Sequence, residues 1–178
     1  MTEEIANRVK VNKEEYKRLL KDENYTDIRF NPKNGALSAI HREHSFDPKR
    51  GIYERNVQDV GYNYGNAVIL GGEPGNKYNV KYTDGTWNGR PFEIAGKETA
   101  TSSNIKKGLN HCASKPNVKI AILYFPNKNF DLQNFNRGLA MYNGIGKSGG
   151  NGFCKFEKII CIEADKIVYE KSHYYSGF

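Results

Sequence analysis

The sequence predicts an α+β protein with a single mixed, mostly antiparallel sheet and about three helices packed on it. Two observations lead to this class. Several short apolar segments, typical of strands, follow one another with little more than turn signals between them. Segments with the period of a helix occur one at a time between groups of these predicted strands. Strands that are joined by short turns pair antiparallel, so a doubly wound parallel fold is not expected. A chain of 178 residues suits one domain, which we place at residues 25–178.

The amino-terminal half is expected to hold a linker, a hairpin, a helix and a strand. Residues 1–24 are rich in charge and predict a linker with one short helix at 14–20. Residues 25–30 and 36–40 alternate in polarity around the turn signal NPKNG, which predicts a hairpin. Residues 51–64 follow with Tyr53, Val57 and Val60 on one helical face. Residues 66–70 (NAVIL) predict a buried strand.

The carboxyl-terminal half is expected to alternate strands with two helices. Residues 78–82 and 91–95 predict a strand pair around DGTWNGR. Ser102 or Ser103 is a favoured N-cap type, and it starts a helix that ends before Pro116. The apolar stripe of this helix consists of Ile105, Leu109 and Cys112.

The remaining elements are a central strand, a third helix and a closing hairpin. Residues 118–125 (VKIAILYF) form the most apolar strand pattern and are expected to be central in the sheet. A helix follows at 130–142, and residues 156–163 and 166–170 predict the hairpin.

Composition favours an anionic partner. The chain has 27 Lys and Arg against 20 Asp and Glu, a net charge of +7, which suits nucleic acid better than a membrane. No apolar run approaches a membrane span, and the amino terminus lacks the apolar region of a secretory signal. The three cysteines form no CxxC pair and are expected to be buried and reduced, which indicates a reducing, cytoplasmic compartment.

Two histidines in the segment HREH are candidates for proton transfer. His41 and His44 lie three residues apart beside Glu43, where a strand runs into a loop. Histidine changes charge near neutral pH and serves as a general acid or base. The same pair can instead supply two zinc ligands, or belong to a solvated loop.

A second candidate site follows the strand at 91–95. Glu93 stands between Phe92 and Ile94 and therefore projects from the opposite face of the strand. Lys97, Thr99 and Thr101 come next, before a helix N-terminus, and this combination can hold a phosphate. A solvent-facing carboxylate and an ordinary capped helix start are the alternatives.

The helix after this loop carries a basic face. Asn104, Lys107 and His111 occur at i, i+3 and i+7, and Lys106 adds a further charge. We predict that Asn104, Lys106, Lys107 and His111 bind RNA phosphates. A plain solvated helix face is the alternative.

No metal or other cofactor is expected. Asp84 and Glu93 are nine residues apart on a predicted hairpin, where paired carboxylates can bind a divalent ion. The metal-dependent nuclease pattern also has a lysine two residues after the glutamate, and this chain has Ala95 there. Asp84, in an Asp-Gly pair, is also a favoured turn residue.

Several short motifs together resemble a known nuclease group. They are Tyr53-Glu54, the run from Gly65 to Ile69, Asp84-Gly85, Asn88-Gly89, Phe92-Glu93-Ile94 and the run from Ser103 to Leu109. They resemble the barnase–EndoU–colicin–RelE-like nucleases. Within that group they are most similar to the C-terminal tRNase domains of contact-dependent inhibition toxins and to phage-borne relatives fused to Mu-type minor head proteins.

This resemblance implies a small α+β domain that cuts RNA, in particular tRNA, without a metal ion. The 2′-hydroxyl attacks the adjacent phosphate and leaves a 2′,3′-cyclic phosphate. His41 or His44 is then the base or acid, Glu93 its partner, and Lys97 and Lys107 stabilise the phosphate that Thr99 or Thr101 positions. The departure at Ala95 would move the role of the missing lysine to Lys97.

The resemblance also implies a cognate immunity protein as partner, no membrane partner, and delivery into a target cell or association with a virion. Two other functions stay open. One is a non-catalytic module that binds nucleic acid or a phage capsid. The other is a metal-dependent DNase built on Glu54, Asp84 and Glu93.

Overall fold

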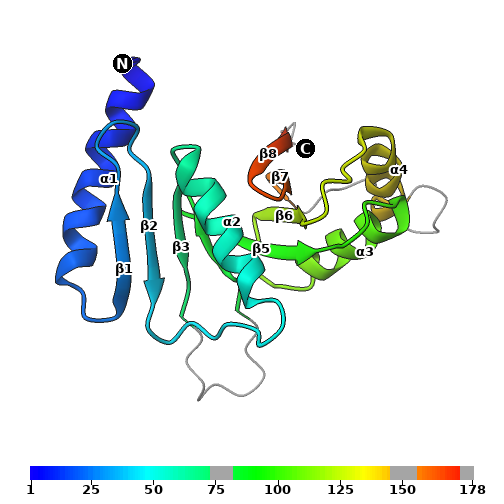
Figure 1. Cartoon of the computed structure of the whole chain (residues 1–178), viewed down its shortest axis with the longest axis horizontal. Helices are drawn as coiled ribbons and strands as arrows, with labels where there is room; N and C mark the ends of the chain where they lie inside the picture. Colours follow the sequence, from blue (N-terminus) through cyan, green and yellow to red (C-terminus); the bar gives the residue numbers. More distant parts are fainter. Residues whose placement is uncertain (73–81, 145–155, 173–178) are drawn as a thin grey trace. The chain divides into compact units, whose positions relative to one another are not determined.

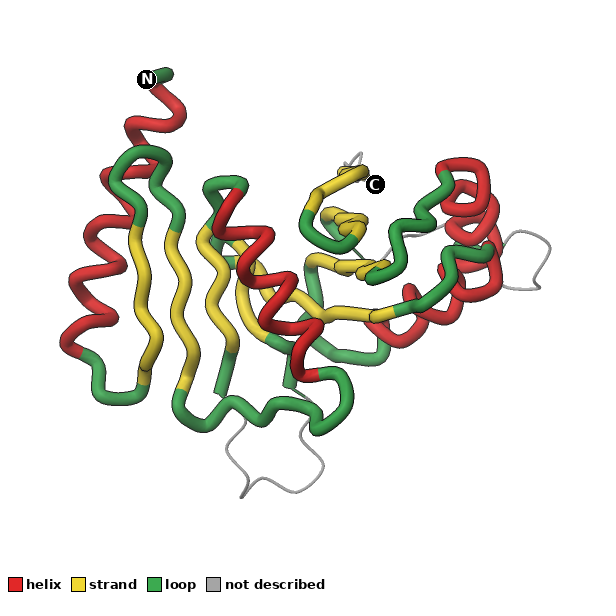
Figure 2. The backbone as a smooth tube through the Cα atoms, in the orientation of Figure 1, coloured by secondary structure: helices red, strands yellow, loops and turns green. Residues whose placement is uncertain are grey.

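The computed structural model describes residues 1–72, 82–144 and 156–172 (Figure 1). The chain divides into two compact units, Met1–Arg90 and Pro91–Phe178. Within the described ranges, each unit has two helices and four strands that follow one another in chain order (Figure 2). The α+β class with a mixed sheet is confirmed. The division at residue 90 does not coincide with the boundary that the sequence predicts at residue 24.

Parallel strand pairs are more frequent than the turn signals predict. In the first unit β2 and β3 run parallel, and in the second unit β5, β6 and β7 do so. In the sequence, a helix separates the two strands of each of these pairs. A helical crossover carries the chain back to the other end of the sheet, so the next strand runs parallel to the one before it. The pairs β1–β2, β3–β4 and β7–β8 are antiparallel.

The first unit places a helix on each face of its strands. Its elements are α1 (Glu3–Lys21), β1 (Tyr25–Phe30), β2 (Leu37–His41), α2 (Gly51–Asn63), β3 (Ala67–Leu70) and β4 (Gly85–Trp87). Gly61 of α2 lies against Val68 and Trp87, where an added Cβ would come within 2.5 Å of Val68 and 2.7 Å of Trp87. Leu19 of α1 packs with Leu37 of β2 and Ala67 of β3. Ala67 precedes Val68 on the strand, so its side chain points to the opposite face of the sheet.

Residues 3–21 form a packed helix where the sequence predicts a linker with one short helix. Thr2 is the N-cap and accepts a hydrogen bond from the Ile5 N–H at 3.2 Å. Arg8 donates to the Asn34 carbonyl and Asn12 to the Gly35 carbonyl, both at 2.7 Å, which joins α1 to the turn between β1 and β2. The many charges suggested a linker, but they lie on the outer face of the helix, where Glu14 pairs with Lys17.

The packing of α1 can be tested at two adjacent leucines. Leu19 is fully buried and Leu20 is 56% exposed. We expect Leu19→Ala to lower the free energy of unfolding by about 2–5 kcal/mol, because it leaves a cavity in a packed core. Leu20→Ala should change it by no more than about 0.5 kcal/mol. Urea denaturation of both variants measures the difference, and equal effects would show that α1 does not pack as described.

The second unit has a parallel core of strands covered by two helices. Its elements are β5 (Arg90–Gly96), α3 (Ser102–Ala113), β6 (Ile120–Phe125), α4 (Leu132–Tyr142), β7 (Lys158–Glu163) and β8 (Lys166–Ser172). All six residues of β6 are buried, and the strand lies between β5 and β7. This confirms that residues 118–125 contain a central strand.

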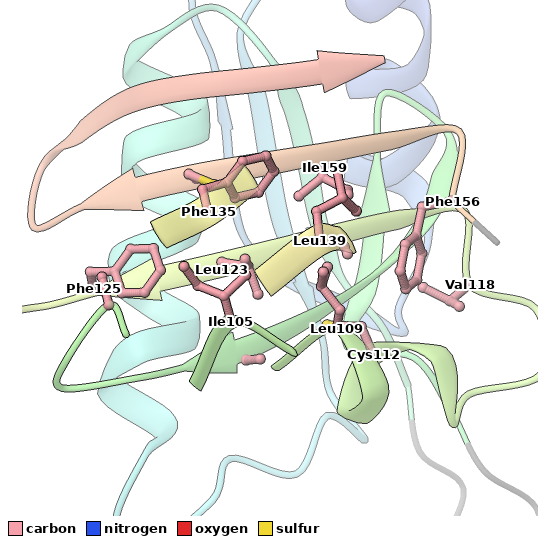
Figure 3. Packing of buried hydrophobic residues seen from close by; sticks show 14 residues of the cluster. Ile105, Leu109, Cys112, Val118, Leu123, Phe125, Phe135, Leu139, Phe156 and Ile159 are labelled. Atoms are coloured by element: carbon pink, nitrogen blue, oxygen red, sulfur yellow. The ribbon is translucent and has the colours of Figure 1, made fainter. Parts of the chain in front are cut away.

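The predicted stripe of α3 is confirmed as part of the core. Ile105, Leu109 and Cys112 are fully buried and pack with Leu123 of β6 and Phe135 of α4. Figure 3 shows these side chains gathered with those of the neighbouring strands. The N-cap is Thr101, which accepts from the Asn104 N–H at 3.1 Å, so the helix begins one or two residues earlier than a cap at Ser102 or Ser103 predicts.

The region around DGTWNGR differs from the prediction. Residues 85–87, predicted as a turn, form β4, and the predicted strand at 78–82 falls almost entirely outside the described residues. The turn lies after β4 instead. Asn88 and Gly89 both have left-handed φ angles, 49° and 82°, which an Asn-Gly pair adopts readily.

Two of the three cysteines are buried, as predicted. Cys112 and Cys161 are fully buried and form no disulfide, and burial raises the pKa of the Cys161 thiol. The third, Cys154, lies outside the described residues. In a Cys154→Ser variant, we expect no reaction of the native protein with a thiol reagent at pH 8, because thiolates react and buried thiols do not. Both thiols should react in guanidinium, and rapid labelling of the native protein would contradict this packing.

Candidate functional site

The central feature of the second unit is a buried carboxylate beside a half-exposed histidine. Glu93, in the middle of β5, is only 3% exposed. Its Oε2 atom lies 3.2 Å from Nε2 of His111 on α3 and 3.6 Å from Nζ of Lys115. The His111 side chain is 52% exposed, so a ligand from solvent can reach the ring. Glu93 therefore does not face solvent, and the Lys115 ammonium group and the His111 ring nitrogen beside it offset the cost of burying the carboxylate.

The helix α3 lies close to β5 because small residues meet between them. Glu93, Ala95 and Lys97 alternate along the strand and share one face. An added Cβ at Gly108 would come within 3.3 Å of the Ala95 Cβ, and Lys97 Cε would be 3.7 Å away. Gly108 lies one turn before His111, so this close approach brings the histidine to Glu93.

The carboxylate also orients the imidazole. A carboxylate oxygen accepts and does not donate, so Glu93 favours a proton on Nε2 of His111. The Nδ1 atom then has the lone pair that can take a proton from a substrate. The strand position is secured in addition by the Cys112 thiol, whose Sγ donates to the Glu93 carbonyl at 3.3 Å.

The loop between β5 and α3 is held by polar contacts at nearly every residue. The Lys97 N–H donates to the Tyr124 carbonyl at 2.9 Å. The Asn104 amide donates to the Thr99 hydroxyl at 2.7 Å and to the Thr99 carbonyl at 3.1 Å. Thr101 caps α3. Asn104 and both threonines, which are predicted to contact phosphate or RNA, thus also stabilise this loop. On α3, Lys106 is partly exposed and Lys107 is exposed.

The histidines of the HREH segment belong to the first unit and have other partners. The His44 side chain is fully buried; Nδ1 lies 2.7 Å from the Gly71 carbonyl and Nε2 lies 3.0 Å from Glu54 Oε1. His41 accepts from the Glu43 N–H at 3.1 Å, and its ring packs edge-on against Tyr25. The predicted acid–base role of His44 conflicts with this burial, since both ring nitrogens are occupied away from solvent.

Sequence reasoning did not predict two of these pairs, His111 with Glu93 and Glu54 with His44. His111 was predicted as an RNA-binding residue, but it supplies the histidine that Glu93 was expected to receive from His41 or His44. Glu54 is 8% exposed, and its Oε2 atom is buried with no hydrogen-bond partner among the described residues. A signal for Glu54 exists, since it precedes the buried Val57, Gln58 and Gly61 at helical spacing.

The described residues contain no group of three or more His, Cys, Asp or Glu side chains placed to bind one metal ion. In this part of the chain, no helix is long and apolar enough to cross a bilayer.

No protein-family model and no curated protein matches this sequence. A solved structure does. The chain shares its fold with one chain of the "CdiA-CT/CdiI toxin and immunity complex from Burkholderia pseudomallei". The TM-score is 0.53 at 16% sequence identity, and the alignment covers 76% of this chain and 99% of that chain. At this identity the similarity concerns the fold.

Proposed function

We propose that this protein is a toxin-type endoribonuclease that cleaves RNA without a metal ion and leaves a 2′,3′-cyclic phosphate. The observation that carries the proposal is the buried Glu93 carboxylate 3.2 Å from the half-exposed His111. A histidine oriented by a carboxylate is a general base, and RNA contains its own nucleophile in the 2′-hydroxyl. The net charge of +7 and the shared fold with a chain of a toxin–immunity complex support the same function.

The reaction gives a task to each side chain. His111 Nδ1 takes the proton of the 2′-hydroxyl as its oxygen bonds to phosphorus. The imidazolium then gives that proton to the 5′ oxygen as its bond to phosphorus breaks, so that proton and bond changes balance. Glu93 orients the ring and stabilises the imidazolium that forms between the two steps. Lys97 and Lys115, which lie where α3 packs on β5, stabilise the charge on the phosphate.

A protein of this kind needs a neutralising partner in the cell that makes it. We propose an immunity protein with an acidic surface, because the chain is basic and the structural neighbour is described as a toxin and immunity complex. tRNA is the substrate that we propose first, and the producing or receiving cytoplasm is the place of action.

The test is incubation of the purified protein with total RNA and with tRNA, with and without a chelator. Cleavage that persists in chelator, with cyclic phosphate at the new 3′ ends, supports the proposal. Salt-sensitive binding without cleavage would favour the non-catalytic module. Loss of cleavage in chelator would favour a metal-dependent nuclease, for which the unsatisfied Oε2 atom of Glu54 is the observation in the structure.

A further inference from the structure

The loop after β6 is fastened to the loop after β5 through one carbonyl group. The side-chain amides of Asn127 and Asn129 both donate to the Glu98 carbonyl, at 3.2 and 2.6 Å. Glu98 follows Lys97 directly, and the Lys97 N–H is itself bonded to Tyr124 of β6. The two loops therefore form one fixed surface, and we refer to the contacts of Asn127 and Asn129 with Glu98 as the amide clamp.

The residue between the two asparagines has an unfavourable backbone conformation. Lys128 has a φ of 54°, in the left-handed region that costs a residue with a Cβ about 1–2 kcal/mol. Glycine adopts this conformation without that cost. Lys128 is exposed, and among the described residues no carboxylate lies within ion-pair distance of its ammonium group. A strained position thus carries an exposed cation instead of glycine.

The location of Lys128 is one where ligands bind in other proteins. β5, β6 and β7 run parallel, and both loops leave the carboxyl ends of their strands. Ligands of α/β sheets commonly bind at this edge. The N-terminus of α3, capped by Thr101, and Lys97 lie at the same edge and favour an anion.

Neighbouring acids at this edge are engaged by backbone amides. Asp131 caps α4 and accepts from the Asn134 N–H at 2.8 Å. Glu163 Oε1 accepts from the Phe130 N–H at 3.0 Å. Glu98 is the remaining acid of the two loops, and its side chain is exposed. Asp131 and Glu163 are therefore directed to backbone amides, and Lys128 stays exposed at this edge.

We propose that Lys128 binds an RNA phosphate and that the amide clamp presents it beside Lys97. The geometry by itself suits any polyanion. That the ligand is RNA rests on the proposed function. The backbone strain at Lys128 is then the cost of fixing a cation where an RNA phosphate lies.

The test uses Lys128→Gly and a 2′-O-methyl RNA oligonucleotide, which lacks the nucleophilic hydroxyl and so measures binding apart from cleavage. We expect the variant to be as stable as the parent or more stable, because glycine relieves the strain. We expect its affinity to fall several-fold near 0.1 M salt, and the salt slope of log K to lose about 0.7, the share of one phosphate contact. Lys10→Ala, which removes an exposed lysine from α1 in the first unit, should leave the slope unchanged.

The double variant Asn127→Ala/Asn129→Ala separates presentation from simple charge. It should weaken RNA binding by the parent protein. In the Lys128→Gly background it should weaken binding little further, since both changes remove the same phosphate contact. Unchanged affinity in Lys128→Gly, fully additive effects, or no binding by the parent protein would each overturn the proposal. Because the binding readout does not need cleavage, an inactive protein that shows the expected slopes would overturn the proposed reaction and leave the role of Lys128 standing.

Discussion

Replacing His111 by alanine should lower the rate of RNA cleavage by about 10²–10⁴-fold, the usual contribution of a general acid or base. Affinity for RNA should change less than tenfold, because the neighbouring lysines remain. The reason is the position of the ring, which lies 3.2 Å from the buried Glu93 carboxylate while the His111 side chain is 52% exposed. Single-turnover cleavage of a short RNA, with affinity measured on a 2′-O-methyl analogue, checks both parts.

Two variants control this experiment. Glu93→Gln keeps the size of the side chain but removes the charge that orients His111, so cleavage should fall while the fold persists. His41→Ala removes one of the two histidines that the sequence offers as acid or base, and it lies in the other unit. Full activity of His111→Ala together with loss in His41→Ala would transfer the proton-transfer role to the HREH segment and reject the site described above.

Restoring the missing motif lysine should damage the fold. Ala95 is 4% exposed and faces Gly108, where an added Cβ would already lie 3.3 Å from the alanine Cβ and 2.9 Å from Leu123. Ala95→Lys must therefore displace α3 or bury an ammonium group. We expect a loss of about 1–3 kcal/mol from overpacking alone and more from the buried charge. Urea denaturation measures the loss.

Ala6→Lys on the exposed side of α1 is the matched control and should alter stability by no more than about 0.5 kcal/mol. Cleavage of RNA should decline in Ala95→Lys, because His111 moves with α3. A variant of undiminished stability that gains chelator-sensitive DNA cleavage would contradict the packing and place the protein with the metal-dependent nucleases. The absence of lysine at position 95 thus has a structural reason in the contact with Gly108.

Local patterns were reliable wherever one face of an element meets one core. The stripe of Ile105, Leu109 and Cys112 and the apolar run of β6 are buried as predicted, since periodicity states which side of an element avoids water. The same reasoning failed for residues 3–21. Charges dominate that segment, and the single buried Leu19 gives no visible stripe.

The candidate site shows the same division. The residue types were recognisable from the sequence: a lone Glu93, a lysine and hydroxyl-rich loop, and a polar face with His111 on the following helix. Which of them meet was decided only by the tertiary structure, because Ala95 and Gly108 let α3 approach β5 and bring together residues 18 positions apart, as 111 minus 93 shows. The sequence by itself determined the α+β class, the central strand and the basic character of the chain. The partner of Glu93, the burial of His44 and the parallel pairing of β5, β6 and β7 depend on which buried faces meet, and that is decided by long-range packing, not by local pattern.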